Sequence, residues 1–126
     1  MRIQKDNIVI RSATVEDAIQ LNKWWNDGRV MKDVGFPKGT GESLEDTIEN
    51  IKRREGKLND LCIIEIDGKP VGELNYNIKG NIAYPGWKIC DLNYQNRGYG
   101  PKIIMMLFTF LFEDKEINSQ CKIEKM

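Results

Sequence analysis

The sequence predicts an α/β fold of the α+β type, with helices flanking a mixed, mostly antiparallel sheet. Three observations support this prediction. Short β-branched runs alternate with amphipathic helical patterns, an Asp-Gly dipeptide joins two of these runs, and a strongly apolar helix follows the last of them. The length of 126 residues suits one domain, so we expect a single domain over residues 1–126.

The elements of the N-terminal half follow from local signals. Residues 8–11 are β-branched and predict a strand. A capping-box pattern at 14–17 begins a helix whose apolar positions recur at helical spacing and which ends at 26–28. Residues 29–42 contain several glycines and read as irregular or partly helical, and a second helix begins at 43. The charge run at its end reads as a solvated helix end rather than a binding patch.

The C-terminal half reads as an antiparallel meander followed by a buried helix. Asp67-Gly68 predicts a two-residue hairpin turn, because both positions tolerate a positive φ. We expect the third strand of the meander to be interrupted at Pro85-Gly86. The predicted elements are strands at 61–66, 71–78 and 82–90, a buried helix carrying the apolar positions of 103–112, and a last strand at 118–124.

Composition excludes several classes of function. The 19 basic residues balance 19 acidic residues, so we expect no nucleic-acid partner. The chain has no His, which excludes Ser-His and Cys-His nucleophiles and His-ligated metal sites, and we expect no metal. The N-terminus shows no apolar leader and no apolar run is long enough to span a bilayer, so we expect no membrane association. Three widely spaced Cys fit a reduced, cytoplasmic protein.

The residues that indicate chemistry lie between the third meander strand and the buried helix. They are Gln95-Asn96-Arg97-Gly98-Tyr99-Gly100. Two glycines allow a tight turn, and the helix that follows offers free N–H groups and the positive end of its dipole. Arg97 and Lys102 add positive charge, so a pyrophosphate-bearing cofactor is the physical inference. The alternative is that Gly98 and Gly100 only form a strand-to-helix turn.

This segment resembles the signature of the GNAT family of acetyl-CoA-dependent N-acetyltransferases. The signature is Gln/Arg-x-x-Gly-x-Gly/Ala, and Gln95-x-x-Gly98-x-Gly100 matches it. The strand at 87–91 lies where the family's cofactor strand lies. The helix carrying Trp24-Trp25-Asn26-Asp27 is similar to the first helix of the ribosomal-protein and aminoglycoside acetyltransferase branch.

The resemblance implies a GNAT-like acyl-CoA N-acyltransferase fold with acetyl-CoA as co-substrate. The backbone around the glycines would hold the pyrophosphate, and the strand before them would pair with the pantetheine arm. The implied cofactor-binding residues are Lys88, Ile89, Cys90, Gln95, Asn96, Arg97, Gly98, Tyr99, Gly100, Pro101 and Lys102.

The resemblance also implies that the acceptor is a primary amine, of a cationic small molecule such as an aminoglycoside or of a protein N-terminus. A base must take the amine proton, and Glu73 and Asp91 are the catalytic candidates by position. The alternative for each is a structural carboxylate. Cys90 reads as a small buried residue, because the family transfers the acyl group directly.

Acceptor binding is expected in the first helix and the segment that follows it. A paired Trp with nearby acids suits a cationic amine, although helical spacing also places Trp25 in the core. The candidate substrate-binding residues are Trp24, Trp25, Asp27, Asp33 and Phe36.

Two features depart from the family pattern. Pro101 has no N–H to give to a phosphate, although proline suits the first turn of a helix. The chain also lacks the family's final helix and strand, so we expect an incomplete C-terminus with an open sheet edge. This leaves three readings: a shortened enzyme, a chain completed by a partner or by a homodimer through that edge, and a non-catalytic CoA-binding module.

Overall fold

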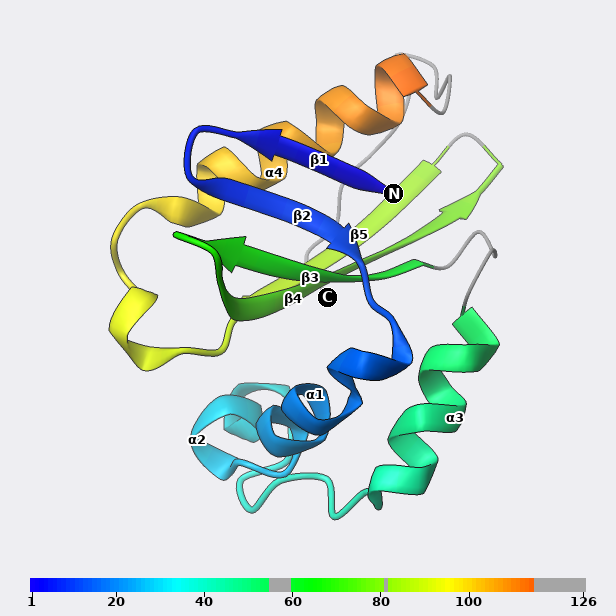
Figure 1. The fold of residues 1–126 in the computed structure, drawn as a ribbon, viewed down its shortest axis with the longest axis vertical. Coiled ribbons are helices and arrows are strands. Elements are labelled where there is room, and N and C mark those ends of the chain that lie inside the picture. The colour runs from blue at the N-terminus through cyan, green and yellow to red at the C-terminus, as the bar shows by residue number, and fades with distance from the viewer. Residues whose placement is uncertain (55–59, 81, 115–126) are drawn as a thin grey trace. The chain divides into compact units, whose positions relative to one another are not determined.

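A computed structural model describes residues 1–54, 60–80 and 82–114 of the chain (Figure 1). The chain divides into two compact units, which we describe separately. The sheet unit comprises Met1–Ser12 and the chain from Gly56 onward, and the helical unit comprises Ala13–Glu55. The expected single domain over 1–126 stays a prediction.

The sheet unit contains a five-stranded sheet in which neighbours along the chain are neighbours in space. Its order is β1-β2-β3-β4-β5, and every pair is antiparallel. This confirms the predicted α+β class with a mostly antiparallel sheet. The strands are β1 (Arg2–Lys5), β2 (Ile8–Ser12), β3 (Asp60–Ile66), β4 (Lys69–Lys79) and β5 (Ile82–Ile89).

The turn between β3 and β4 is the one that the Asp-Gly dipeptide predicts. Asp67 and Gly68 have φ values of 56° and 78°, and Ile66 pairs with Lys69 across the turn. Two consecutive positive φ values define the hairpin turn that matches the right-handed twist of the strands. These two residues therefore fix the pairing of β3 and β4 next to the turn.

One face of the sheet packs against helix α4 (Tyr99–Thr109), which continues into a π-helical turn at Phe110–Asp114 (Figure 1). Aliphatic side chains from all the central strands meet the helix there, and Tyr76 contacts the edge of the Phe110 ring. The fully buried side chains of this core include Ile8, Ile10, Ile64, Ile66, Leu74, Ile103, Leu107 and Leu111.

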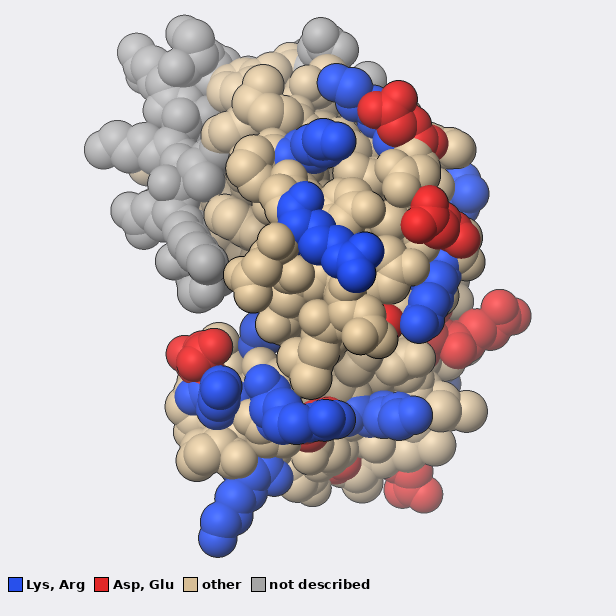
Figure 2. Space-filling view, turned by 90° about the vertical axis from the view of Figure 1, so that its left-hand side faces the viewer, with Lys and Arg blue, Asp and Glu red and all other residues tan. Residues whose placement is uncertain are grey.

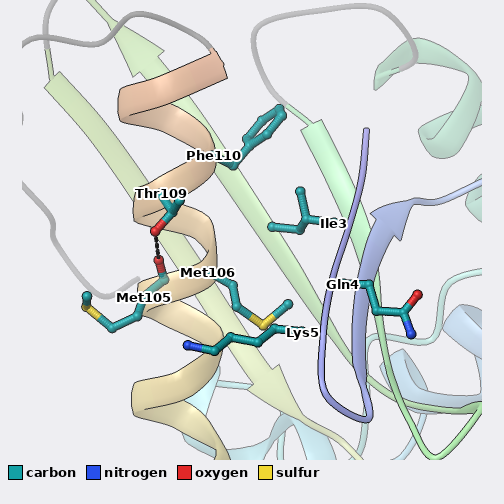
Figure 3. Close-up of a pocket in the computed structure, with 7 residues that line it drawn as sticks. All are labelled: Ile3, Gln4, Lys5, Met105, Met106, Thr109 and Phe110. Atoms are coloured by element: carbon teal, nitrogen blue, oxygen red, sulfur yellow. Dashed lines mark hydrogen bonds between the residues drawn. The ribbon is translucent and has the colours of Figure 1, made fainter.

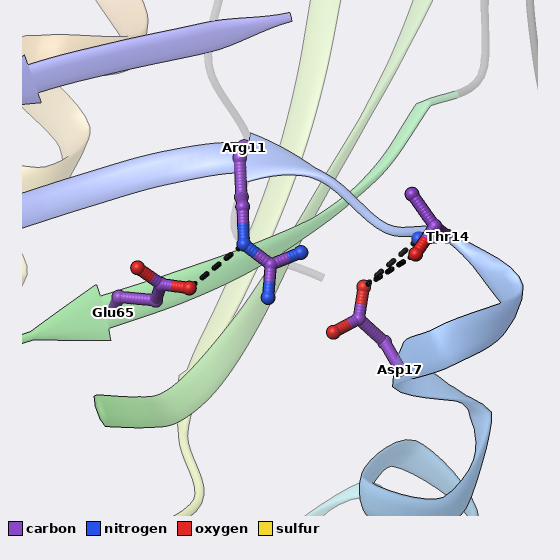
Figure 4. A network of polar contacts seen from close by, with 4 residues as sticks. All are labelled: Arg11, Thr14, Asp17 and Glu65. Atoms are coloured by element: carbon purple, nitrogen blue, oxygen red, sulfur yellow. Dashed lines mark hydrogen bonds and ion pairs between the residues drawn. The ribbon is translucent and has the colours of Figure 1, made fainter. Parts of the chain in front are cut away.

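The opposite face of the sheet carries apolar and polar side chains together. Ile63 and Leu61 are buried there, whereas Arg11 of β2 donates from its Nε to Glu65 of β3 at 2.8 Å (Figure 4). Arg11 and Glu65 are diagonal neighbours, because Arg11 is opposite Ile63 and Val9 is opposite Glu65. Alternation along β4 places Glu73, Asn75 and Asn77 on this same face.

The structure corrects two expectations. Strand β1 has no counterpart in the prediction, because its sequence, Arg-Ile-Gln-Lys, is mostly polar and exposed. Strand β5 is not interrupted at Pro85-Gly86: the ladder continues, and Pro85 lies opposite Tyr76. An edge position tolerates a proline nitrogen that faces away from the ladder, and β5 is at the edge of the described sheet.

The apolar helix is largely buried, as predicted, although part of its surface is exposed. Phe112 is 38% exposed and Met105 is 60% exposed, although Ile103 and Leu107 are fully buried. One stripe of the helix therefore packs on the sheet. The predicted strand at 118–124 and part of the charge run at 52–57 lie outside the described residues.

The helical unit contains α1 (Ala18–Trp25), the short α2 (Gly28–Met31) and α3 (Leu44–Arg54). The predicted capping box precedes α1: the backbone N–H of Thr14 donates to the carboxylate of Asp17 at 2.9 Å (Figure 4). Helices α1 and α3 contact each other through buried side chains that include Leu21 and Ile51.

Polar side chains also join the elements of this unit. The hydroxyl of Thr47, which is fully buried, donates to Glu42 Oε2 at 2.8 Å and accepts from Asn22 Nδ2 at 3.1 Å. Asn22 and Asn26 both donate to the carbonyl of Glu42. The segment before α3 is therefore tied to α1 by hydrogen bonds.

Candidate functional site

The candidate site is built around the exit of the chain from β5. The extra residue of β4, Val71, forms a bulge where the β3–β4 register shifts between Ile64 and Glu65. Its carbonyl accepts from the N–H groups of both Cys90 and Asp91, at 2.7 and 2.9 Å. These two bonds end the strand and set the direction of the loop that follows.

Gly72 allows β4 and β5 to approach closely at the same point. A Cβ on this residue would lie 2.2 Å from the carbonyl oxygen of Lys88, which is a backbone atom and has little freedom to move. Only glycine fits there without a shift of β5. The sequence signals neither this close approach nor the bulge.

Asp91 turns the chain out of the sheet. Its Oδ1 accepts from the backbone N–H of Asn93 at 2.9 Å, and its Oδ2 lies 3.0 Å from Lys69 Nζ. The Asn93 N–H and then the Lys69 ammonium lower the pKa of this carboxyl. A carboxylate whose pKa is lowered is a weaker base, so this geometry favours the structural alternative for Asp91.

Two cations lie near the ring of Tyr94. Lys69 Nζ is 5.9 Å from the centroid of its ring and Arg97 Cζ is 5.7 Å from it, within the range of cation–π attraction. The Tyr99 ring is 6.3 Å away. Neither Lys69 nor Tyr94 was among the sequence candidates, because no motif links them.

The glutamine of the motif holds the loop to the strand. Gln95 Nε2 donates to the carbonyl of Ile89 at 2.8 Å. Since the Cys90 N–H points to Val71 on β4, strand alternation directs the backbone groups of Ile89 to the other side, which is the free edge of the described sheet. Of the three strand residues assigned to pantetheine, only Ile89 therefore presents its N–H to that edge.

The glycine turn leads directly into α4. Asn96 and Gly98 have φ values of 60° and 78°, and Gly98 is the N-cap of the helix. Helix geometry leaves the N–H groups of Gly98, Tyr99 and Gly100 without an intrahelical partner, and Pro101, in the first turn, has none to offer. The positive φ of Gly98 explains why the motif has glycine at this position.

The charges around this helix start suit an anion. Arg97 and Lys102 are exposed, and residues 95–102 contain no acid. Figure 2 shows the surface from the side of this loop, where Lys and Arg side chains occur together with several Asp and Glu side chains. Free N–H groups, the helix dipole and two cations together fit a pyrophosphate. The residues of the loop therefore fit the phosphate end of a CoA-type ligand.

Glu73 and Cys90 lie near each other beside the loop. Glu73 of β4 is opposite Lys88 of β5 in the register of the sheet. Burial, and then the negative charge of Glu73, raise the pKa of the Cys90 thiol. Cys90 is therefore a neutral thiol at physiological pH, in accord with its interpretation as a small buried residue.

The acceptor candidates all belong to the helical unit. Trp24 and Trp25 are both buried, at 7% and 8% exposure, so little of either ring is accessible. Asp27 caps α2 through the Arg29 N–H and pairs with the Arg29 guanidinium at 2.9 Å, which lowers the pKa of Asp27. Asp33 and Phe36 are exposed. An acceptor role for these five residues stays a prediction.

A separate pocket of about 400 Å³ lies between β1 and α4 (Figure 3). None of the predicted site residues lines it. Its lining is mostly apolar and comprises Ile3, Gln4, Lys5, Met105, Met106, Thr109 and Phe110. The Thr109 hydroxyl is already bonded to the carbonyl of Met105 at 3.0 Å.

Comparison with solved structures shows which fold this is. A GNAT-family acetyltransferase from Bacillus anthracis aligns with a TM-score of 0.72 at 23% identity, over 93% of this chain and 69% of its own. RimL, a ribosomal L7/L12 alpha-N-protein acetyltransferase in complex with coenzyme A, aligns with a TM-score of 0.78 at 18% identity, over 93% and 71%. Aminoglycoside acetyltransferase AAC(6')-Ib, also with coenzyme A, aligns with a TM-score of 0.71 at 19% identity, over 94% and 73%.

The chain therefore has the fold of the GNAT acetyltransferases. This confirms, for the fold, the resemblance that the Gln95-x-x-Gly98-x-Gly100 motif indicates. No protein-family model and no curated protein matches the sequence significantly. Among the residues that the structure describes, no helix is both long enough and apolar enough to cross a membrane.

Proposed function

We propose that this chain is an acetyl-CoA-dependent N-acetyltransferase that acts on a primary amine. The observation that carries the proposal is the glycine turn between β5 and α4, in which Gly98 adopts a φ of 78° at the start of a helix within a GNAT fold. Acetyl-CoA supplies an activated acyl group as a thioester. Solved structures of the same fold are described with coenzyme A or acetyl-CoA bound, which supports this co-substrate.

In this proposal the loop residues hold the phosphates and β5 holds the arm. The N–H groups of Gly98, Tyr99 and Gly100 bind pyrophosphate oxygens, and Arg97 and Lys102 add charge. Gln95 fixes the loop against Ile89, whose N–H is directed to the free edge of the described sheet. In the proposal that N–H polarises the thioester carbonyl.

Glu73 is the proposed proton acceptor. The amine nitrogen forms a bond to the carbonyl carbon, and the amine proton passes to the Glu73 carboxylate directly or through water. The carbon–sulfur bond breaks with its electron pair on sulfur, so CoA leaves as a thiolate that takes a proton from the solvent. Asp91 has a positioning role in the proposal, because Asn93 and Lys69 already occupy its two oxygens. The described structures of this fold include acetyltransferases for ribosomal proteins and for aminoglycosides, which supports these two classes of acceptor.

Two measurements on the full chain test this function. Calorimetry is expected to show acetyl-CoA binding that Gly98→Val weakens, since valine is strained at a positive φ. A thiol-release assay with a polyamine, an aminoglycoside and a peptide with a free N-terminal Ser is expected to show turnover with one of them. Absence of acetyl-CoA binding would contradict the proposal, and binding without thiol release would indicate a non-catalytic CoA-binding module.

A homodimer through the C-terminal sheet edge stays a prediction, because residues 118–124 lie outside the described part of the chain. Light scattering over a concentration series tests it. A constant monomer mass at high concentration would rule out self-association.

A further inference from the structure

Among the described residues of the sheet unit, one buried side-chain oxygen has no hydrogen-bond partner. The side-chain oxygen of Asn75, Oδ1, is buried and makes no hydrogen bond. Leaving a buried acceptor unpaired costs roughly 1–3 kcal/mol, so native structures seldom contain one without a reason. Asn75 lies on β4, two residues from Glu73, on the face of the sheet that does not pack against α4.

The neighbours of Asn75 in the sheet explain why the oxygen is unpaired. Across the ladder, Asn75 is opposite Leu61 of β3 and Gly86 of β5. A leucine side chain has no donor, and glycine has no side chain. Along the strand, the nearest side chain on one side is Glu73, whose carboxylate only accepts. On the other side is Asn77, whose amide group can donate, but the Asn75 oxygen accepts no hydrogen bond from it. The residues opposite and beside Asn75 therefore leave this oxygen unpaired.

Asn75 belongs to a short row of polar side chains on this face of the sheet. Glu73, Asn75 and Asn77 of β4 are opposite Lys88, Gly86 and Tyr84 of β5. The missing side chain at Gly86 lies directly across from the unpaired oxygen. An unpaired amide oxygen at this position favours a ligand that donates a hydrogen bond, and the N–H of an amine is such a donor.

We propose that Asn75 is an acceptor-binding residue, and that its Oδ1 accepts a hydrogen bond from an N–H of a cationic amine bound beside Glu73. This inference rests on the proposed function and adds a specificity-determining residue to it. In the free protein the unpaired oxygen destabilises the fold, and the bound amine provides the missing donor.

The test uses Asn75→Leu, which removes the oxygen with little change in volume. Because the unpaired acceptor disappears, the variant is expected to unfold at a higher temperature than the wild type in the absence of ligand. Asn22→Leu is the control for this measurement, since Asn22 donates to Glu42 and Thr47 and its loss is expected to lower the unfolding temperature. An Asn75→Leu protein that is less stable than the wild type would overturn the inference.

Amine binding is measured by calorimetry, without and with saturating CoA, so that it does not depend on turnover. The probes are spermidine, an aminoglycoside and a peptide with a free N-terminal Ser. Asn75→Leu is expected to weaken the tightest of these amines about tenfold or more and to leave CoA affinity unchanged. Asn77→Leu, on the same strand and face, is expected to change amine affinity less than twofold.

The outcomes separate this inference from the proposed function. Equal amine affinities in Asn75→Leu and wild type, equal losses in Asn75→Leu and Asn77→Leu, or no amine binding to the wild type would each overturn the role of Asn75. Absence of CoA binding would overturn the proposed function, whereas the amine and stability measurements would still decide the role of Asn75.

Discussion

Each of the two units is stabilised internally, and the interactions that stabilise them differ in kind. In the sheet unit, local hairpins set the register and an apolar stripe of α4 fills one face of the sheet. In the helical unit, a buried hydroxyl and two amide side chains bind the segment before α3 to α1. The strands therefore depend on the close packing of apolar side chains, whereas the segment before α3 depends on hydrogen bonds to α1.

The largest expected effect is on the apolar core of the sheet unit. Leu107→Ala removes a fully buried side chain from α4 and is expected to destabilise the fold by about 3 kcal/mol. Leu92→Ala is the control, because Leu92 is 48% exposed and its loss is expected to cost less than about 0.5 kcal/mol. Urea unfolding measures both. Similar losses of unfolding free energy in the two variants would contradict the conclusion that the sheet unit depends on the packing of its core.

The next largest loss of stability is expected at Gly72, where β4 and β5 approach each other closely. Gly72→Ala places a Cβ against the Lys88 carbonyl, so β5 must shift, at an expected cost of about 2 kcal/mol. The same substitution at Gly100 is the control, because its nearest neighbour is a side-chain atom at 3.5 Å. Urea unfolding measures the stability of both variants. Equal free energies of unfolding would contradict the close approach of the two strands.

In the helical unit, Thr47→Val keeps the shape of the side chain and removes its hydrogen bonds. We expect a loss of about 1–2 kcal/mol, since Glu42 and Asn22 lose a buried partner. Thr109→Val in α4 is the matched control, because that exposed hydroxyl bonds only within its own helix. Thermal unfolding measures both variants. Equal unfolding temperatures would contradict a stabilising role for the hydrogen bonds of Thr47.

Each unit also contains an aspartate that caps a short helix and pairs with a cation: Asp27 caps α2, and Asp91 caps the 3-10 helix Leu92–Tyr94. Asp91→Ala is expected to cost about 1 kcal/mol, because the Asn93 N–H loses its acceptor. The lowered pKa of Asp91 means that its charged form stabilises the fold above its ordinary pKa, and this contribution is lost as pH falls through the lowered value.

The pH dependence is tested with Asp91→Asn, which keeps the cap and removes the charge. The difference in unfolding free energy between the wild type and Asp91→Asn is expected to be constant near neutral pH and to disappear in acid. Asp27→Asn in the helical unit is expected to behave in the same way, since Arg29 lowers the pKa of Asp27. A difference that grows as pH falls would contradict both assignments.

The smallest expected effect concerns the start of α4. Pro101→Thr restores an N–H in the first turn and is expected to tighten acetyl-CoA binding about fivefold, the effect of one further hydrogen bond. Calorimetry measures this change. Unchanged affinity would count against the proposed position of the phosphates.

The sequence by itself determined the features that depend on a few neighbouring residues. Asp67-Gly68 specifies the hairpin because both residues accept a positive φ, and Gly98 with the apolar stripe behind it specifies the turn into α4. The capping box at Thr14 and Asp17 is equally local. These local patterns are sufficient to predict the fold class and the candidate phosphate-binding loop.

Only the tertiary structure decided what depends on strands that are distant in sequence. The bulge at Val71, the approach of Gly72 to Lys88 and the unbroken pairing at Pro85 depend on which strand lies opposite. The same is true of Asn75, whose unpaired oxygen lies at a strand position opposite a leucine and a glycine. A local pattern encodes backbone preference, whereas hydrogen-bond partners across a sheet are set by register.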